Sequence, residues 1–326
     1  MDKWVSEHLA CPRDHTALSL KDNILSCEKE HKYFMIENIP VMLLDDVEQT
    51  HSVATESLKA AYEYHSQHNF KNELANKNLI DPYVQEFIAA TNGIMWRPLI
   101  NKLKCYPIPK LPINDIQKGY FLDIGCNWGR WCISAALKDY VPVGIDPSLD
   151  AIMAAKRVAK QLGITAHFIV ADARYLPFKE NSFDFVFSYS VLQHLEKEGV
   201  KSCLKEICRI LKISGTSLIQ MPNKFGLRNM FNQIKHCLRK AYVFDVKYWS
   251  ISELSIAFRS NIGSTNIFAD GFLNLNPDTA NVNLLPVYYR IVVYLSEILR
   301  KLSKKFTFLI NIADSVYVKS ISTKVV

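Results

Sequence analysis

The residues best suited to chemistry lie at the junction between an apolar run and a helix-like segment. In the stretch Tyr120–Trp131, Asp123 follows the apolar run and precedes Gly125, Asn127 and Gly129. Glycine permits a sharp turn at positive φ and lets a ligand lie against the main chain, and asparagine tolerates the same backbone angles better than other side chains. A helix that begins after such a turn offers unpaired N–H groups. The stretch therefore predicts a nucleotide-type binding turn.

Two further acids follow the next two strand-like runs. Asp146 ends the run 143–146, 23 residues after Asp123, where a carboxylate can accept hydrogen bonds from both hydroxyls of a ribose. Asp172 follows the run 166–170 and is expected beside the same cleft. The glycines do not form the G-x-G-x-x-G pattern of a dinucleotide site, which argues against a nicotinamide-binding domain.

With these elements in this order, the chain resembles the class I S-adenosylmethionine-dependent methyltransferases, most closely over residues 116–222. The segment 123–129 takes the place of the usual D/E-x-G-x-G-x-G motif, with Asn127 at the middle glycine. The resemblance implies S-adenosyl-L-methionine as cofactor, with glycines beside its methionine part, Asp146 at the ribose and Asp172 at the adenine amino group. The cofactor-binding residues that it implies are Asp123, Gly125, Cys126, Asn127, Gly129, Asp146, Pro147, Asp172, Ala173 and Ser188.

Strand-like runs and helical stripes alternate around these motifs. Helical stripes occur at 150–162 and 199–211, and strand-like runs occur at 183–188, 216–221, 265–271 and 315–321. Such alternation requires a parallel sheet with right-handed crossovers. We expect the fold class α/β, a Rossmann-like class I methyltransferase sheet that is parallel except for an antiparallel last strand, plus a small β-rich ribbon-like domain at the N-terminus.

That N-terminal segment carries a second set of chemically active side chains. Two knuckle-like pairs, Cys11 with Asp14 and Cys27 with His31, are separated by 12 residues, close to the spacing of a zinc ribbon. The segment is similar to the zinc-ribbon-like domain of several methyltransferases, and its second pair is similar to the ribbon of large-subunit rRNA guanine-N1 methyltransferases. Asp14 stands where cysteine is usual, with His15 as a rival ligand. The sequence leaves open whether this segment binds zinc or folds as a metal-free mini-domain.

The chain divides into three expected parts. These are a ribbon-like module with degenerate ligands at 1–47, a helical linker or lid at 48–115, and a methyltransferase domain at 116–326 with an insertion at about 272–314. In the resembled family the helix before the first motif often covers the cofactor. Tyr62, Tyr64 and His65 are therefore candidates for a lid.

The insertion contains the strongly apolar segment 284–305, which ends in basic residues. This pattern fits a buried core helix, an acceptor-binding helix, a dimer face or a peripheral membrane contact. From Pro222 onward there are 14 Lys and Arg against 6 Asp and Glu, a charge of +8, whereas the whole chain carries +7. A basic lobe beside a methyl-transfer site suggests an anionic acceptor, RNA or a membrane surface, with a solvated face as the alternative.

A hydroxyl acceptor needs a base to remove its proton. His194, just past the fourth strand of the domain, is the candidate catalytic base, and a structural role is the alternative. Tyr189 and Gln193 are alternative polar contacts to the acceptor, and Asn223 and Arg228 could orient or neutralise it.

The sequence therefore predicts an S-adenosylmethionine-dependent O-methyltransferase of a small molecule or glycan, anionic or lipid-linked acceptors included. An RNA base methyltransferase is the alternative, and a non-catalytic cofactor-binding regulatory partner is a second one. No signal peptide and no run of 18 uncharged apolar residues occur, so we expect a cytoplasmic protein with reduced cysteines. The acceptor atom and the oligomeric state stay open.

Overall fold

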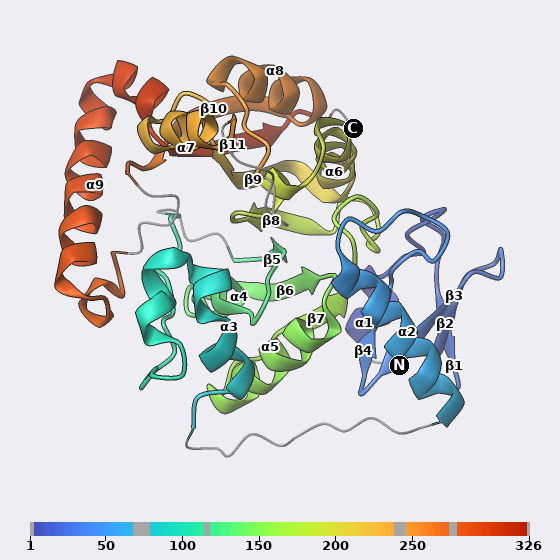
Figure 1. The fold of residues 1–326 in the computed structure, drawn as a ribbon. Coiled ribbons are helices and arrows are strands. Elements are labelled where there is room, and N and C mark those ends of the chain that lie inside the picture. The colour runs from blue at the N-terminus through green and yellow to red at the C-terminus, as the bar shows by residue number, and fades with distance from the viewer. Residues whose placement is uncertain (1–2, 68–78, 114–117, 238–245, 274–278, 325–326) are drawn as a thin grey trace.

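The structure, a computed structural model, describes residues 3–67, 79–113, 118–237, 246–273 and 279–324 (Figure 1). Its N-terminal part consists of a short helix and a four-stranded antiparallel sheet in the order β1-β2-β3-β4. The bounds are α1 (Lys3–His8), β1 (Ser19–Lys21), β2 (Ile24–Ser26), β3 (Lys32–Ile36) and β4 (Ile39–Pro40). This small separate sheet confirms the predicted β-rich N-terminal region.

A seven-stranded sheet forms the centre of the molecule, in the order β10-β11-β9-β8-β5-β6-β7. All neighbouring strands are parallel except β11, which is antiparallel to both β9 and β10. The bounds are β5 (Tyr120–Ile124), β6 (Val141–Asp146), β7 (His167–Val170), β8 (Phe183–Ser188), β9 (Leu211–Pro222), β10 (Gly263–Gly271) and β11 (Ser315–Ser322). The predicted α/β fold with an antiparallel last strand is confirmed.

Helices connect and cover these strands. They are α2 (Ser52–Gln67), α3 (Pro82–Asn92), α4 (Arg130–Ala136), α5 (Leu149–Gln161), α6 (Lys197–Ile210), α7 (Leu227–Cys237), α8 (Ile251–Asn261) and α9 (Val287–Lys305), with 3-10 turns η1 (Ile94–Leu99), η2 (Leu192–His194), η3 (Val282–Leu284) and η4 (Thr307–Ile312). Helix α8 has Ser250 as its N-cap, because Ser250 and Glu253 form a reciprocal capping box.

The two faces of the large sheet have different side chains because residues alternate along each strand. On one face Leu122 and Val186 belong to the main apolar core with side chains of α6 and α8. On the other face Phe121, Phe185 and Phe187 pack with Trp131 of α4. The second face is therefore aromatic.

The N-terminal part packs against the β7 side of the large sheet. Val41 bridges to Val170, and the N–H of Met42 donates to the carbonyl of Val170 at 2.7 Å. The rings of Trp4 and His167 stack with centroids 4.0 Å apart. Figure 1 shows this part and helix α9 on opposite sides of the molecule. The exact boundaries of the three expected parts stay a prediction.

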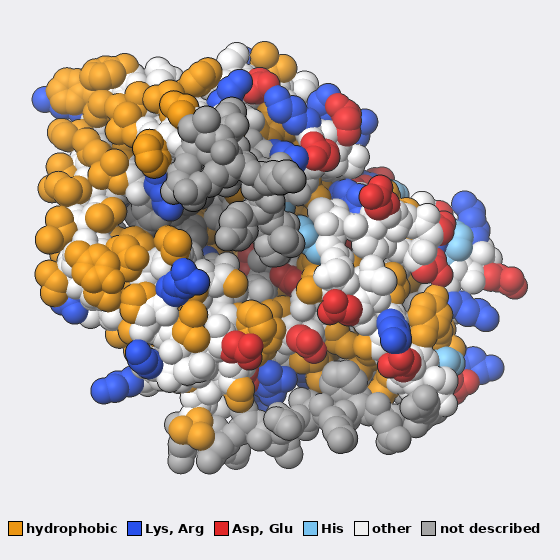
Figure 2. Space-filling view, viewed as in Figure 1, with side chains coloured by type: hydrophobic (Ala, Val, Ile, Leu, Met, Phe, Trp, Pro, Cys, Tyr) orange, Lys and Arg blue, Asp and Glu red, His pale blue; other side chains and the backbone are white. Residues whose placement is uncertain are grey.

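Helix α9 is not the buried core helix that its apolar pattern allowed. Its buried residues are Val293, Ser296 and Ser303. Its apolar stripe faces outward and forms the hydrophobic area at the left of Figure 2. The exposed apolar residues of α9 are Val287, Tyr288, Ile291, Tyr294, Leu295, Ile298 and Leu302. Within the described residues, no helix combines the length and apolar character needed to cross a bilayer.

Candidate functional site

The turn from β5 to α4 holds three residues in the left-handed backbone region. The φ angles are 73° at Gly125, 47° at Asn127 and 81° at Gly129. The N–H groups of Gly125 and Cys126 both donate to the carbonyl of Ile145 on β6, at 2.8 and 2.9 Å. Asn127 thus adopts the conformation that its residue type tolerates, and the turn keeps its shape without the middle glycine.

Asp146, at the end of β6, braces this turn. One carboxylate oxygen accepts from the N–H of Asn127 and the other accepts from the N–H of Ser148, both at 3.0 Å. Burial raises the pKa of Asp146 to about 6, and these two hydrogen bonds act in the opposite direction. Each carboxylate oxygen keeps a second lone pair that could accept from a ligand hydroxyl.

Asp123, which lies beneath the turn, is fully buried. Its Oδ2 accepts from the thiol of Cys132 at 3.6 Å, whereas its Oδ1 has no hydrogen-bond partner among the described residues. Burial raises the pKa of Asp123 to about 7, and the charge of Arg130 opposes that rise. A buried carboxylate oxygen without a donor is costly, so this atom fits a ligand that supplies a cationic donor.

A small cavity of about 50 Å³ lies over the turn. Four predicted cofactor-binding residues line it together: Gly125, Pro147, Asp172 and Ala173. The sequence prediction missed the rest of the lining, which consists of Thr50, His51, Ala54, Ile124, Ile145, Ala171, Val191 and Leu195. Ligand pockets usually span roughly 300–1,000 Å³. A nucleoside-sized cofactor therefore requires side chains of this lining to move.

The side chains of three other predicted cofactor residues already pack or form hydrogen bonds within the protein. The Ser188 hydroxyl is buried and donates to the carbonyl of Ile124 at 3.0 Å. The buried side chain of Cys126 packs in an apolar cluster with Cys132. The carboxylate of Asp172 accepts from the Arg174 guanidinium at 2.6 Å. An adenine amino group that donates to Asp172 would therefore share this carboxylate with Arg174.

The segment just before α2, rather than the middle of that helix, covers the cavity. His51 lines the cavity, whereas Tyr62 donates to Asp45 at 2.9 Å and the ring of His65 stacks on Phe34 at 4.6 Å. Both side chains thus face the N-terminal sheet, because α2 packs on β3. The lid predicted at Tyr62, Tyr64 and His65 stays a prediction, and in this structure Tyr64 packs against the apolar cluster that includes Leu149.

His194 lies at the same edge as this cover. Its ring is 6.2 Å from the ring of His51, and its Nε2 is 3.2 Å from the side-chain nitrogen of Gln193. Burial lowers the pKa of His51. On the opposite side of the turn, the Tyr83 hydroxyl accepts from the Asn127 amide at 3.3 Å. Tyr83 belongs to a helix without any motif, so no local signal in the sequence could have identified it.

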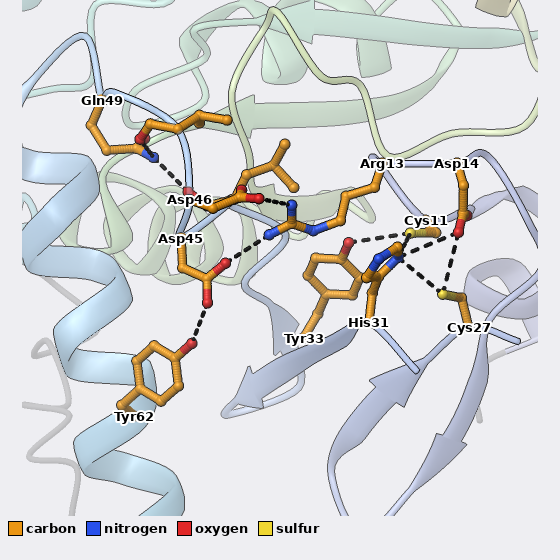
Figure 3. Close-up of polar contacts among 12 residues, drawn as sticks. Cys11, Arg13, Asp14, Cys27, His31, Tyr33, Asp45, Asp46, Gln49 and Tyr62 are labelled. Atoms are coloured by element: carbon orange, nitrogen blue, oxygen red, sulfur yellow. Dashed lines mark hydrogen bonds and ion pairs between the residues drawn. The ribbon is translucent and has the colours of Figure 1, made fainter. Parts of the chain in front are cut away.

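The N-terminal sheet brings the four predicted metal ligands together (Figure 3). The ligand atoms of Cys11, Asp14, Cys27 and His31 all lie within 4.8 Å of one another. His31 Nδ1 is 3.5 Å from the Cys11 sulfur, 3.4 Å from the Cys27 sulfur and 3.3 Å from Asp14. Zinc bound tetrahedrally by sulfur and nitrogen separates its ligands by about 3.3–3.8 Å. The rival ligand His15 instead faces Glu206 at 3.6 Å.

Comparison with known proteins identifies the domain that contains this turn. The family described as "Methyltransferase domain" matches residues 121–215, from β5 into the start of β9. Residues 121–215 therefore form a methyltransferase domain, which supports an S-adenosylmethionine-dependent methyltransferase. Helix α4 and strands β6 to β8 all lie inside the matched region.

Similar proteins cover different parts of this methyltransferase. An uncharacterized protein of Methanocaldococcus jannaschii, MJ0638, is 27% identical over 57% of this chain and 72% of its own. Ajmaline N-methyltransferase of Rauvolfia serpentina is 30% identical over 30% of this chain and 34% of its own. The solved structure of YcgJ from Bacillus subtilis is 17% identical, covers 64% of this chain and 93% of its own, and has a TM-score of 0.46.

Replacing Gly125 with alanine should destabilise the protein for two separable reasons. The added Cβ would lie 2.2 Å from a Val191 methyl, and φ is 73°. Gly163 has a φ of 68°, and an added Cβ there would meet nothing within 4 Å, so Gly163→Ala isolates the backbone strain. Chemical denaturation should show a loss of about 1–2 kcal/mol for Gly163→Ala and about 1–3 kcal/mol more for Gly125→Ala. Equal losses would refute the clash with Val191.

Proposed function

We propose that this methyltransferase transfers a methyl group to a hydroxyl of a small molecule or glycan, anionic or lipid-linked acceptors included. S-adenosylmethionine supplies an activated methyl group, so the protein must mainly align the acceptor and exclude water. The observation that carries the cofactor assignment is the unpartnered Oδ1 of Asp123, buried beneath the left-handed turn. The matched methyltransferase domain supports it.

In this proposal three acids and the turn hold the cofactor. Asp123 would accept from the ammonium of its methionine part, and Gly125 and Gly129 would let that part approach the main chain. Asp146 would accept from the ribose hydroxyls through its remaining lone pairs. Asp172, Ala173 and Pro147 would line the adenine side, where they already border the cavity.

His194 is the proposed base for the acceptor hydroxyl. It follows β8, and the carboxyl ends of parallel strands are where open α/β sheets bind ligands. Its neighbour His51 lines the cavity and His194 itself does not, so His194 stands one ring, at 6.2 Å, behind that lining. A neutral imidazole there could take the hydroxyl proton as the methyl group is transferred.

Two variants should separate cofactor binding from turnover. Asp146→Ala should weaken S-adenosylhomocysteine binding in calorimetry by about tenfold to a hundredfold, because hydrogen bonds to a charged group are lost. The exposed neighbour Asp150 provides the control variant Asp150→Ala. His194→Ala should keep that affinity and lower turnover by about a hundredfold or more. Unchanged affinity in Asp146→Ala would refute the ribose assignment, and unchanged turnover in His194→Ala would refute the base.

Turnover can be followed with radiolabelled S-adenosylmethionine and two acceptor pools. One pool is total RNA, and the other is an extract of small molecules, glycans and lipids. Label in the extract, lost on treatment that cleaves methyl ethers or esters, supports the proposal. Label in RNA would favour the alternative, for which the ribbon-like sheet and the basic C-terminal third provide binding surfaces.

We further propose that Cys11, Asp14, Cys27 and His31 bind zinc. Four of the six separations among their ligand atoms are 3.3 to 3.6 Å, as around a tetrahedral zinc, and all six are within 4.8 Å. The Tyr33 hydroxyl lies 3.2 Å from the Cys11 sulfur and could orient it as an outer-shell partner. All four ligands come from one polypeptide segment, as in a structural site with no open position.

Freshly purified protein should contain about one equivalent of zinc by elemental analysis. Cys27→Ser should lose most of this metal, whereas Cys208→Ser, a cysteine of α6 outside the cluster, should retain it. Chelation should lower the melting temperature of the wild type but not that of Cys27→Ser, because metal binding contributes free energy only to the folded state. A wild type with less than about a tenth of an equivalent would refute the zinc proposal.

A third proposal concerns the outward face of α9, which fits the surface of an anionic membrane. Its apolar side chains recur along one stripe, and the exposed Lys301 and Lys305 lie near the C-terminal end of the helix. Basic side chains near an anionic surface each contribute about 1 kcal/mol. A second copy of the chain would instead bring like charges together, which disfavours a dimer through this face.

Sedimentation with vesicles tests this contact. The protein should bind vesicles that contain phosphatidylglycerol more strongly than pure phosphatidylcholine vesicles. Ile291→Gln with Ile298→Gln, both 55% exposed, should reduce binding about tenfold, because two apolar side chains no longer enter the lipid. Ile256→Gln on α8, 67% exposed, is the matched control. Equal binding by all variants, or a dimer that the double variant dissociates, would refute the membrane contact.

A further inference from the structure

A large cavity lies between α4, α9 and the aromatic face of the large sheet. Its volume is about 610 Å³, within the range of ligand pockets. Phe185, Leu218 and Tyr317 form its floor on β8, β9 and β11. Protein interiors are normally packed without voids of this size. The cavity is separate from the smaller one that the cofactor residues line.

One wall of the cavity is a continuous row of aromatic rings. The centroids of Trp131 and Tyr189 are 5.1 Å apart, those of Tyr189 and Tyr317 are 5.9 Å apart, and those of Tyr317 and Phe268 are 5.6 Å apart. The Arg130 guanidinium lies over two of these rings, 5.4 Å from Trp131 and 5.7 Å from Tyr189. Such a wall favours a ligand with a flat ring or apolar body.

The two acids of the cavity are already engaged. Glu297 accepts from the Arg300 guanidinium at 2.6 and 2.7 Å. Asp270 accepts from the hydroxyls of Tyr189 at 2.9 Å and Ser315 at 2.6 Å. The charge of Glu297 is therefore balanced by Arg300, and Asp270 is tied to the wall of the cavity by two hydroxyls.

The cations outnumber these acids. Five line the cavity: Lys110, Arg130, Arg300, Lys304 and Lys319. Among the described residues, no carboxylate forms an ion pair with Lys110, Lys304 or Lys319. The lining thus has a net positive charge that an anionic group would neutralise.

The inner end of the cavity borders the turn from β5 to α4, which is called the cofactor turn from here on. Arg130 directly follows Gly129, the last residue of the turn. Tyr189 directly follows Ser188, whose hydroxyl bonds to the end of β5. The aromatic wall therefore begins at the carboxyl ends of β5 and β8, where a group held in the cavity can extend toward the cofactor turn.

We propose that this cavity binds the methyl acceptor, and that the acceptor carries a phosphate-like anionic group together with a ring or apolar body. Its anionic group would meet Lys304 and Lys319, and its body would lie along the aromatic wall. The acceptor role depends on the proposed methyl transfer. Binding of a ligand in the cavity can be measured without methyl transfer.

Calorimetry with 1-naphthyl phosphate, in the absence of cofactor, tests the cavity. The wild type should bind this probe more tightly than 1-naphthol or inorganic phosphate, since each of these lacks one half of the recognised chemistry. Lys304→Gln with Lys319→Gln should raise the Kd about tenfold or more, because bonds to the charged phosphate are lost. Lys301→Gln is the matched control, since Lys301 lies on α9 but does not line the cavity.

The proposal is overturned if the wild type does not bind 1-naphthyl phosphate, if 1-naphthol binds equally well, or if the double variant binds like the wild type. S-adenosylhomocysteine titrated into the same variants should give wild-type affinity. Failure of that titration in the wild type would count against the proposed function instead. Displacement of the probe by dihexanoylphosphatidic acid would identify a lipid headgroup as the source of the anion, and displacement by uridine monophosphate alone would identify a soluble phosphoester.

Discussion

The hydrogen bond from the Asn127 N–H to Asp146 is the contact on which the site depends. It joins the turn after β5 to the end of β6, and two more bonds from the turn reach Ile145 on the same strand. Of the three residues at positive φ only Asn127 carries a side chain, and its conformation is costly unless the surroundings hold it. Parallel pairing of β5 with β6 provides that constraint, so the cofactor turn is shaped by the sheet as much as by its glycines.

A second set of contacts connects the proposed zinc ligands to the segment that covers the cofactor site. Arg13 stands between two of the proposed ligands, and its guanidinium donates to Asp45 and Asp46 at 2.7 and 2.5 Å (Figure 3). Thr50 and His51, a few residues later, line the small cavity. The N-terminal sheet therefore serves as the support that holds this cover over the turn.

The sequence predicted the central domain well because its signals are local. Each strand of the large sheet follows from apolar runs and turn residues within a few positions. The cluster of Cys11, Asp14, Cys27 and His31 was also predictable, since its spacing lies within one short segment. Tyr83 and His51 were not, because they reach the site through packing of α3 on α5 and of α2 on β3 and α5. No local motif near either residue in the sequence indicates that it lies at the site.

Helix α9 shows why periodicity alone cannot assign a surface. An apolar stripe at helical spacing identifies an amphipathic helix, and such a stripe normally faces the core. Here the orientation is reversed: Ser296 and Ser303 are buried and the apolar stripe faces outward. The Ser296 hydroxyl accepts the N–H of Phe272, at the N-terminal edge of the insertion, at 2.9 Å, and this bond fixes that orientation. Because Arg300 and Lys304 then border the large cavity, one reversed helix places cations over a ligand site and apolar side chains at the surface. In the two proposals the cationic side of α9 meets the anionic group of the acceptor, and the apolar side is left to contact a membrane surface.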